Sequence, residues 1–125
     1  MTPTTVTVEL SVARVGSGGN TAQGQYFYSF NPANILIYEP DTQVILELSK
    51  DTADNFEIWR LVTSDNSNQL SDMVRSSGNR QLSFSNANSV EQLILVSVLV
   101  IDKANDGRIV NCDPQMINVP RGGIG

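Results

Sequence analysis

The sequence predicts an all-β fold, an antiparallel β-sandwich of immunoglobulin-like shape with about seven to nine strands. Short stretches in which apolar and polar residues alternate recur along the 125 residues, and Gly, Pro, Asn and Asp separate them. Charged residues make up 17% of the chain, below the usual quarter, and this composition favours strands and turns over long exposed helices. A closed β-barrel is the alternative architecture.

Five strands are predicted in the first half of the chain, at residues 5–12, 25–30, 34–38, 43–49 and 56–62. The first is the clearest, because Val6, Val8, Leu10 and Val12 alternate with polar residues and therefore share one face. Residues 16–20, which contain three glycines, end this strand in a loop.

The strand predicted at residues 56–62 carries the single tryptophan. Phe56 and Ile58 share one face of this strand, whereas Trp59 and Leu61 share the other. We expect Trp59 to be a core residue, because a large aromatic side chain contributes much apolar area to a small domain. If it is exposed instead, its ring is a candidate for sugar binding.

Further strands are predicted at residues 80–85, 90–102 and 109–112. One short helical turn is expected before them, within residues 69–79 and ending at Gly78. Residues 90–102 give the strongest strand pattern, and their nearly continuous apolar run predicts a central strand covered on both faces. Asp106 and Gly107 then form a tight hairpin turn.

Residues 1–120 are expected to form one domain, followed by a flexible tail at residues 121–125. The start of the chain has neither a basic nor an apolar segment of the signal-peptide type, and no apolar run approaches the roughly 20 residues of a membrane helix. With a single cysteine as well, the sequence predicts a cytoplasmic protein that does not bind membranes. A net charge of −5 argues against nucleic-acid binding, since phosphate backbones repel an acidic surface.

The residue types present exclude several kinds of chemistry. The chain has no histidine, so it cannot form a copper site of the usual kind or a Ser-His-Asp arrangement, and one thiol cannot anchor a structural zinc ion. No cation adjoins Cys112, and Asp113 opposes formation of its thiolate, so we interpret Cys112 as a small buried apolar residue. We therefore predict a protein that is not an enzyme and needs no cofactor.

Acidic residues provide weak candidates for a calcium site. Asp102, Asp106 and Asp113, with Gly107 between them, partly match the spacing of an EF-hand loop. The flanking segments are strand-like, however, and a hairpin turn at residues 106–107 explains the glycine more simply. A second acidic group at residues 51–57 is interpreted as a solvated loop, with calcium binding as the alternative.

Two proline motifs carry a resemblance to a known family. The segments IYEPDTQV (residues 37–44) and VNCDPQMINVP (residues 110–120) resemble the DP-EP family, small bacterial proteins of uncharacterised function. The resemblance places Glu39-Pro40 in one motif and Asp113-Pro114 in the other and implies a compact β domain without a known catalytic residue. A fainter likeness is to the PixA/AidA-type inclusion-body proteins, which are also β-sandwich proteins. Physically, each proline is expected to bend the chain at the end of a strand.

Three functional hypotheses follow. The first is a structural or binding module that forms homo-oligomers, with the strands near the chain ends offering edges to another subunit. The second is a calcium- or carbohydrate-binding module, and the third is a hydrolase whose Glu39 and Asp113 lie within about 10 Å. The ligand would be a small molecule of unknown identity, and its candidate binding residues are Glu39, Asp41, Trp59, Asp113 and Gln115.

Overall fold

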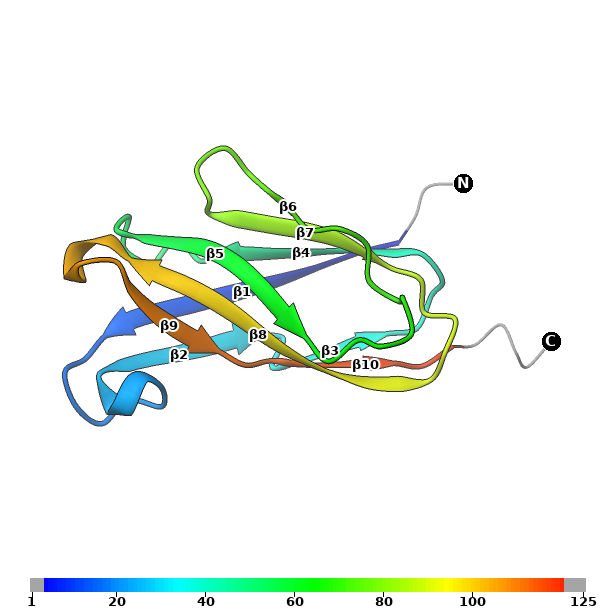
Figure 1. Cartoon of the computed structure of the whole chain (residues 1–125), viewed down its shortest axis with the longest axis horizontal. Helices are drawn as coiled ribbons and strands as arrows, with labels where there is room; N and C mark the ends of the chain where they lie inside the picture. Colours follow the sequence, from blue (N-terminus) through cyan, green and yellow to red (C-terminus); the bar gives the residue numbers. More distant parts are fainter. Residues whose placement is uncertain (1–3, 121–125) are drawn as a thin grey trace.

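Two β-sheets face each other across an apolar core in the computed structural model, which describes residues 4–120 (Figure 1). The strands are β1 (Thr5–Arg14), β2 (Tyr26–Asn31), β3 (Asn34–Ile37), β4 (Thr42–Leu48), β5 (Phe56–Thr63), β6 (Val74–Arg75), β7 (Gln81–Asn86), β8 (Gln92–Asp102), β9 (Arg108–Cys112) and β10 (Gln115–Asn118). Two 3₁₀ turns accompany them, η1 (Ala22–Gly24) and η2 (Lys103–Asn105). The prediction of an all-β fold is therefore confirmed.

The first sheet has the strand order β2-β1-β4-β7-β6, and the second has the order β3-β10-β8-β5, with β9 also paired to β8. Most neighbours are antiparallel, but β1 pairs with β4 in parallel and β3 pairs with β10 in parallel. The prediction of an antiparallel fold is therefore wrong for these two pairs. The barrel alternative is also wrong, because the two sheets remain separate and each keeps its own edge strands.

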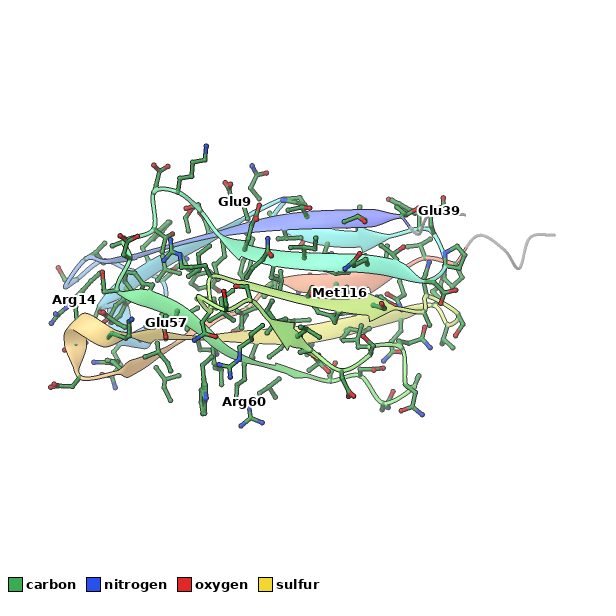
Figure 2. All side chains as sticks on the ribbon, turned by 90° about the horizontal axis from the view of Figure 1, so that it is seen from above. Glu9, Arg14, Glu39, Glu57, Arg60 and Met116 are labelled. Atoms are coloured by element: carbon green, nitrogen blue, oxygen red, sulfur yellow. The ribbon has the colours of Figure 1, made fainter. Side chains whose placement is uncertain are left out.

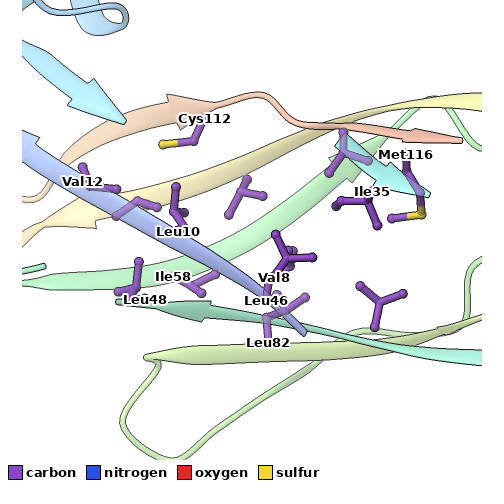
Figure 3. Packing of buried hydrophobic residues seen from close by; sticks show 14 of the residues in the cluster. Val8, Leu10, Val12, Ile35, Leu46, Leu48, Ile58, Leu82, Cys112 and Met116 are labelled. Carbon is purple, nitrogen blue, oxygen red and sulfur yellow. The ribbon is translucent and has the colours of Figure 1, made fainter. Parts of the chain in front are cut away.

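The core forms from the inward-facing side chains of both sheets (Figure 3). Val8, Leu10 and Val12 of β1 are buried, as the alternation predicts, and the same rule buries Leu46 of β4 and Leu82 of β7. Each such side chain contributes about 1.5–3 kcal/mol through removal of apolar surface from water. The core fixes the register of the strands, since a slip of one residue would turn these side chains outward.

The predicted short helical turn within residues 69–79 is wrong. Val74 and Arg75 form an edge strand against β7 instead. The preceding loop is held by the Asp65 carboxylate, which accepts hydrogen bonds from three backbone N–H groups, the last of them that of Leu70 at 3.0 Å. Burial opposes ionisation of Asp65, but these hydrogen bonds outweigh it and lower the pKa of the carboxyl group. Side chain–backbone hydrogen bonds of this kind compete with helix formation.

A β-bulge in β5 overturns the prediction that Trp59 lies in the core. The pairing of β5 with β8 shifts between Ile58 and Arg60, so Trp59 is an extra residue in the ladder. Its side chain is 36% exposed. The same shift reverses the alternation beyond the bulge, and Leu61 packs against the core instead of sharing a face with Trp59.

Strand β8 is central, as predicted, because β5 pairs with one of its edges and β9 and β10 pair with the other. The prediction that both of its faces are covered is wrong. Ile94, Val96 and Val98 point into the core, but Leu93 and Leu95 point outward and are 52% and 55% exposed.

The predicted flexible tail at residues 121–125 lies outside the described residues. In the part of the chain that is described, no helix is both long enough and apolar enough to cross a bilayer.

Candidate functional site

The Asp113-Pro114 motif interrupts one long strand. Val98 of β8 pairs with Cys112 of β9, and Leu95 of β8 pairs with Gln115 of β10, so a single register runs through both strands. This register places Asp113 opposite Ser97 and Pro114 opposite Val96. Because proline has no N–H to donate to a ladder, it separates β9 from β10 without reversing the chain.

A shallow hollow of about 250 Å³ lies at this interruption, lined by Leu95, Val96, Ser97, Asp113, Pro114 and Gln115. The Asp113 carboxylate is exposed and accepts hydrogen bonds from the Ser97 hydroxyl at 3.0 Å and from the Asn111 side-chain amide at 3.5 Å. Asp113 and Gln115, two of the predicted binding residues, therefore lie together, with the apolar Leu95 and Pro114 beside them.

Cys112 points away from this hollow and into the core (Figure 3). Burial raises the pKa of its thiol to about 12, and the negative charge of Asp113 adds to the shift. The thiolate, which is the nucleophilic form, is therefore scarce at neutral pH. The interpretation of Cys112 as a small buried apolar residue is confirmed.

The Glu39-Pro40 motif belongs to the connection between β3 and β4. The carbonyl oxygen of Glu39 accepts hydrogen bonds from the Thr42 hydroxyl at 2.7 Å and from the Asn88 side chain at 3.3 Å. Asp41 has a positive φ of 51° and donates its N–H to the carbonyl of Ala87. Glu39 and Asp41 therefore lie in one turn, at the end of the molecule opposite Arg14 (Figure 2).

The two proline motifs lie apart. In the parallel β3–β10 pair, Gln115 is opposite Asn34 and Asn118 is opposite Ile37, so Asp113 precedes this ladder and Glu39 follows it. At about 3.3 Å per residue, the seven residues between their levels correspond to roughly 23 Å. The carboxylate pair that the hydrolase hypothesis requires within about 10 Å is not formed.

The three weak calcium candidates do not converge. Asp102 is 1% exposed and pairs with protein groups, accepting hydrogen bonds from the Tyr26 hydroxyl at 2.6 Å and from the Ala104 N–H at 3.0 Å. Asp106 has a φ of 55° in the hairpin turn, beside Gly107 at 70°. Asp113 lies five residues farther along the β8 ladder, about 17 Å from Asp102. Within residues 4–120, no three acidic or cysteine side chains gather as a set that could hold a metal ion.

A buried polar network joins β2 to the β8–β9 hairpin, and no sequence pattern predicted it. The Tyr26 hydroxyl donates to Asp102 and accepts from the Asn105 side chain at 2.9 Å. Burial, followed by the Asp102 carboxylate, raises the pKa of Tyr26. The three side chains satisfy one another's hydrogen-bonding groups, so this network stabilises the hairpin.

In the acidic segment 51–57, Glu57 forms an ion pair with Lys103 at 2.9 Å.

Trp59 lies at another place on the molecule. It borders a hollow between β5 and the β6–β7 pair, together with Met73 and Arg75. The guanidinium group of Arg60 lies 5.3 Å from the centre of its ring, which is within cation–π distance. The five predicted binding residues are thus distributed over three places: Glu39 with Asp41, Asp113 with Gln115, and Trp59 alone.

The outward side of the second sheet exposes many apolar side chains, and we call it the apolar face. Its members are Leu36, Val62, Leu93, Leu95, Leu99, Ile101, Ile109 and Ile117. Leu36, Ile117 and Leu93 lie directly opposite one another on β3, β10 and β8 and form a continuous row. The hollow at Asp113 lies on this same face, beside Leu95. In Figure 2, Arg60 projects from this side of the molecule and Glu9 from the other.

In comparisons with known proteins, no protein-family model matches the chain and no curated protein is similar to it.

Proposed function

We propose that this chain is a non-enzymatic, immunoglobulin-like β-sandwich module that binds a second copy of itself through the apolar face. The observation that carries the proposal is the row formed by Leu36, Ile117 and Leu93, together with Leu95 beside it. Monomeric proteins rarely expose contiguous apolar patches of more than a few hundred Å², and larger patches are typical of interaction surfaces.

The charges on this surface favour a second copy as the partner. The chain carries a net charge of −5, so two copies repel each other on average. The outward charged side chains of the second sheet are Glu57, Arg60 and Asp113, and Lys103 neutralises Glu57. The apolar face therefore carries no net charge, and two copies can meet there without repulsion between like charges.

The size of the surface indicates how strong the association should be. Strand β8 has 11 residues, so the sheet is about 35 Å long and about 15 Å wide, or roughly 500 Å² per copy. Two such faces bury about 1,000 Å², the lower limit for a specific interface. We therefore expect a weak dimer whose population depends on concentration.

The mode of association differs from the sequence-based expectation of pairing at strand edges. Strand β1 lies between β2 and β4, and β10 lies between β3 and β8, so neither is an edge strand of its sheet, although residues 5–8 of β1 pair with β4 alone. A sheet face, rather than a sheet edge, carries the proposal. The resemblance to the DP-EP family and the cytoplasmic location remain predictions.

Light scattering coupled to size exclusion tests the proposal over protein concentrations from about 0.01 to 1 mM. We expect the mass to rise from monomer towards dimer, and we expect Leu95→Lys to suppress the rise because it places a charge in the apolar contact. Thr7→Lys is the matched control, since Thr7 is an exposed residue of the interior strand β1 on the outer side of the first sheet. A wild-type mass that stays monomeric throughout would contradict the proposal.

A further inference from the structure

The hollow at Asp113 has the size of one side chain. Its volume of about 250 Å³ lies below the roughly 300–1,000 Å³ that is usual for small-molecule pockets. Leu95 and Pro114 provide apolar walls, and the exposed Asp113 carboxylate provides one negative charge. A long cationic side chain fits this combination, because its aliphatic stem packs on apolar walls while its charged end reaches the carboxylate.

The carboxylate retains capacity for such a partner. An ionised carboxylate has about four acceptor positions, and Ser97 and Asn111 each occupy one on Asp113. The remaining positions can accept the parallel N–H groups of a guanidinium group, a geometry that arginine satisfies better than lysine.

Arg60 is the arginine that the apolar face presents. It pairs with Leu99 across the β5–β8 ladder, which directs it outward, and it is exposed. Its guanidinium group lies over the Trp59 ring at the β5 edge of the sheet, beside the hollow that Trp59 and Arg60 both line with the β6–β7 pair. The other cation near this face, Lys103, already pairs with Glu57.

Arg60 and Asp113 flank β8 on opposite sides. Arg60 lies at the level of Leu99, and Asp113 lies at the level of Ser97 two residues away. Two strand spacings and two residues along the strand separate their backbones by roughly 12 Å. Within one copy the side chains of Arg60 and Asp113, both of which the structure describes, form no ion pair with each other. A two-fold axis that crosses β8 between these levels would instead place each Arg60 against the Asp113 of the other copy.

We propose that, in the dimer described above, Arg60 of each copy occupies the Asp113 hollow of the other and forms two symmetric ion pairs that fix the relative orientation of the copies. This inference rests on the proposed function and adds to it the residues that determine specificity. The apolar row supplies most of the affinity, and the ion pairs select the register.

Charge reversal tests the inference by sedimentation equilibrium of the intact chain. We expect Arg60→Glu and Asp113→Arg each to weaken association by about tenfold or more, because each change creates two like-charge contacts per dimer. The double variant restores opposite charges and should return to within about threefold of wild type. Arg14→Glu is the control for altered net charge, since Arg14 is exposed on β1 in the first sheet, and it should leave association unchanged.

Two further measurements keep the test decisive. Thermal unfolding of each variant shows whether it is folded, and Arg60→Gln, which introduces no opposite charge, should weaken association about threefold if Arg60→Glu is unstable. If the double variant associates as weakly as the single variants, the inference about Arg60 and Asp113 is overturned. The proposed function still stands in that case, provided that the wild type associates and that Leu95→Lys suppresses the association. A wild type that remains monomeric overturns both.

Discussion

The outer faces of the two sheets are built alike but differ in chemistry. On the first sheet, Thr7, Ile45 and Ser83 lie directly opposite one another on β1, β4 and β7. On the second sheet, Leu36, Ile117 and Leu93 form the corresponding row on β3, β10 and β8. Both rows have isoleucine at the centre, but the first surrounds it with hydroxyl groups and the second with leucines. The neighbours of an exposed apolar residue, rather than its presence, therefore distinguish a solvated face from a contact surface.

The strands that carry these rows show the same difference. Strand β1 alternates polar and apolar residues from Thr5 to Val12, as expected of a strand with one face in water. Strand β8 places leucine or isoleucine at most of its outward positions, although the described chain leaves that side exposed. Four variants, compared in three experiments, test how far this difference determines stability and association.

The largest expected effect separates the two sides of β8. Ile94→Ala removes a fully buried side chain and should lower the free energy of unfolding by about 2–5 kcal/mol. Leu95→Ala changes a side chain that is more than half exposed and should cost less than about 1 kcal/mol when the protein is monomeric. Urea unfolding at low protein concentration measures both changes. Equal losses would mean that the outward side of β8 is buried even in the monomer.

The second effect concerns Cys112, which lies on the inner side of β9 next to the outward-facing Asp113. Its pKa is raised from 9.0 to about 12, so above pH 9 the unfolded chain releases the thiol proton while the folded chain keeps it. The contribution of the protonated thiol to the free energy of unfolding is fully present below pH 9. It declines between about pH 9 and 12, by up to about 1.4 kcal/mol per pH unit.

Comparison with Cys112→Ala isolates this contribution from the other groups that titrate in the same range. The difference in unfolding free energy between wild type and variant should be constant below pH 9 and shrink above it. A constant difference up to pH 11, or rapid modification of the thiol in the folded protein at pH 8, would show that Cys112 is accessible to water.

The smallest expected effect comes from making the outer row of the first sheet as apolar as the row of the second sheet. The double variant Thr7→Leu/Ser83→Leu surrounds Ile45 with leucines and imitates the row of the second sheet. We expect a new, weak association through the first sheet, visible as a higher average mass at about 1 mM, because the surface becomes apolar without gaining an arginine and a carboxylate in matching positions. If the mass equals that of wild type at every concentration, an apolar row alone is not sufficient for contact.

The inward faces of several strands were predictable from the sequence, whereas the candidate site was predictable only in part. Alternation of period two identified Val8 and Leu10 because a regular strand obeys it. It misplaced Trp59 because a bulge adds one residue and reverses the pattern beyond it.

The features that form the site depend on pairing between distant segments. The hollow at Asp113 requires the register of β8 against β9 and β10, which no local pattern specifies. The bond between Tyr26 and Asp102 joins residues 76 positions apart, so it could not be inferred from spacing. The proline motif identified Asp113 and Gln115, but the apolar face around them forms only when the fold brings the outward residues of five strands together.

A dilution series followed by backbone amide NMR spectra of the wild-type chain tests directly whether the apolar face binds a second copy. We predict that the amide shifts that change with concentration cluster on β3, β8 and β10, around Leu36, Leu93, Leu95 and Ile117, while those of Thr7 and Ser83 stay constant. Changes concentrated on β1, β4 and β7, or spectra that do not change up to about 1 mM, would contradict the assignment of the apolar face as the surface that binds a second copy.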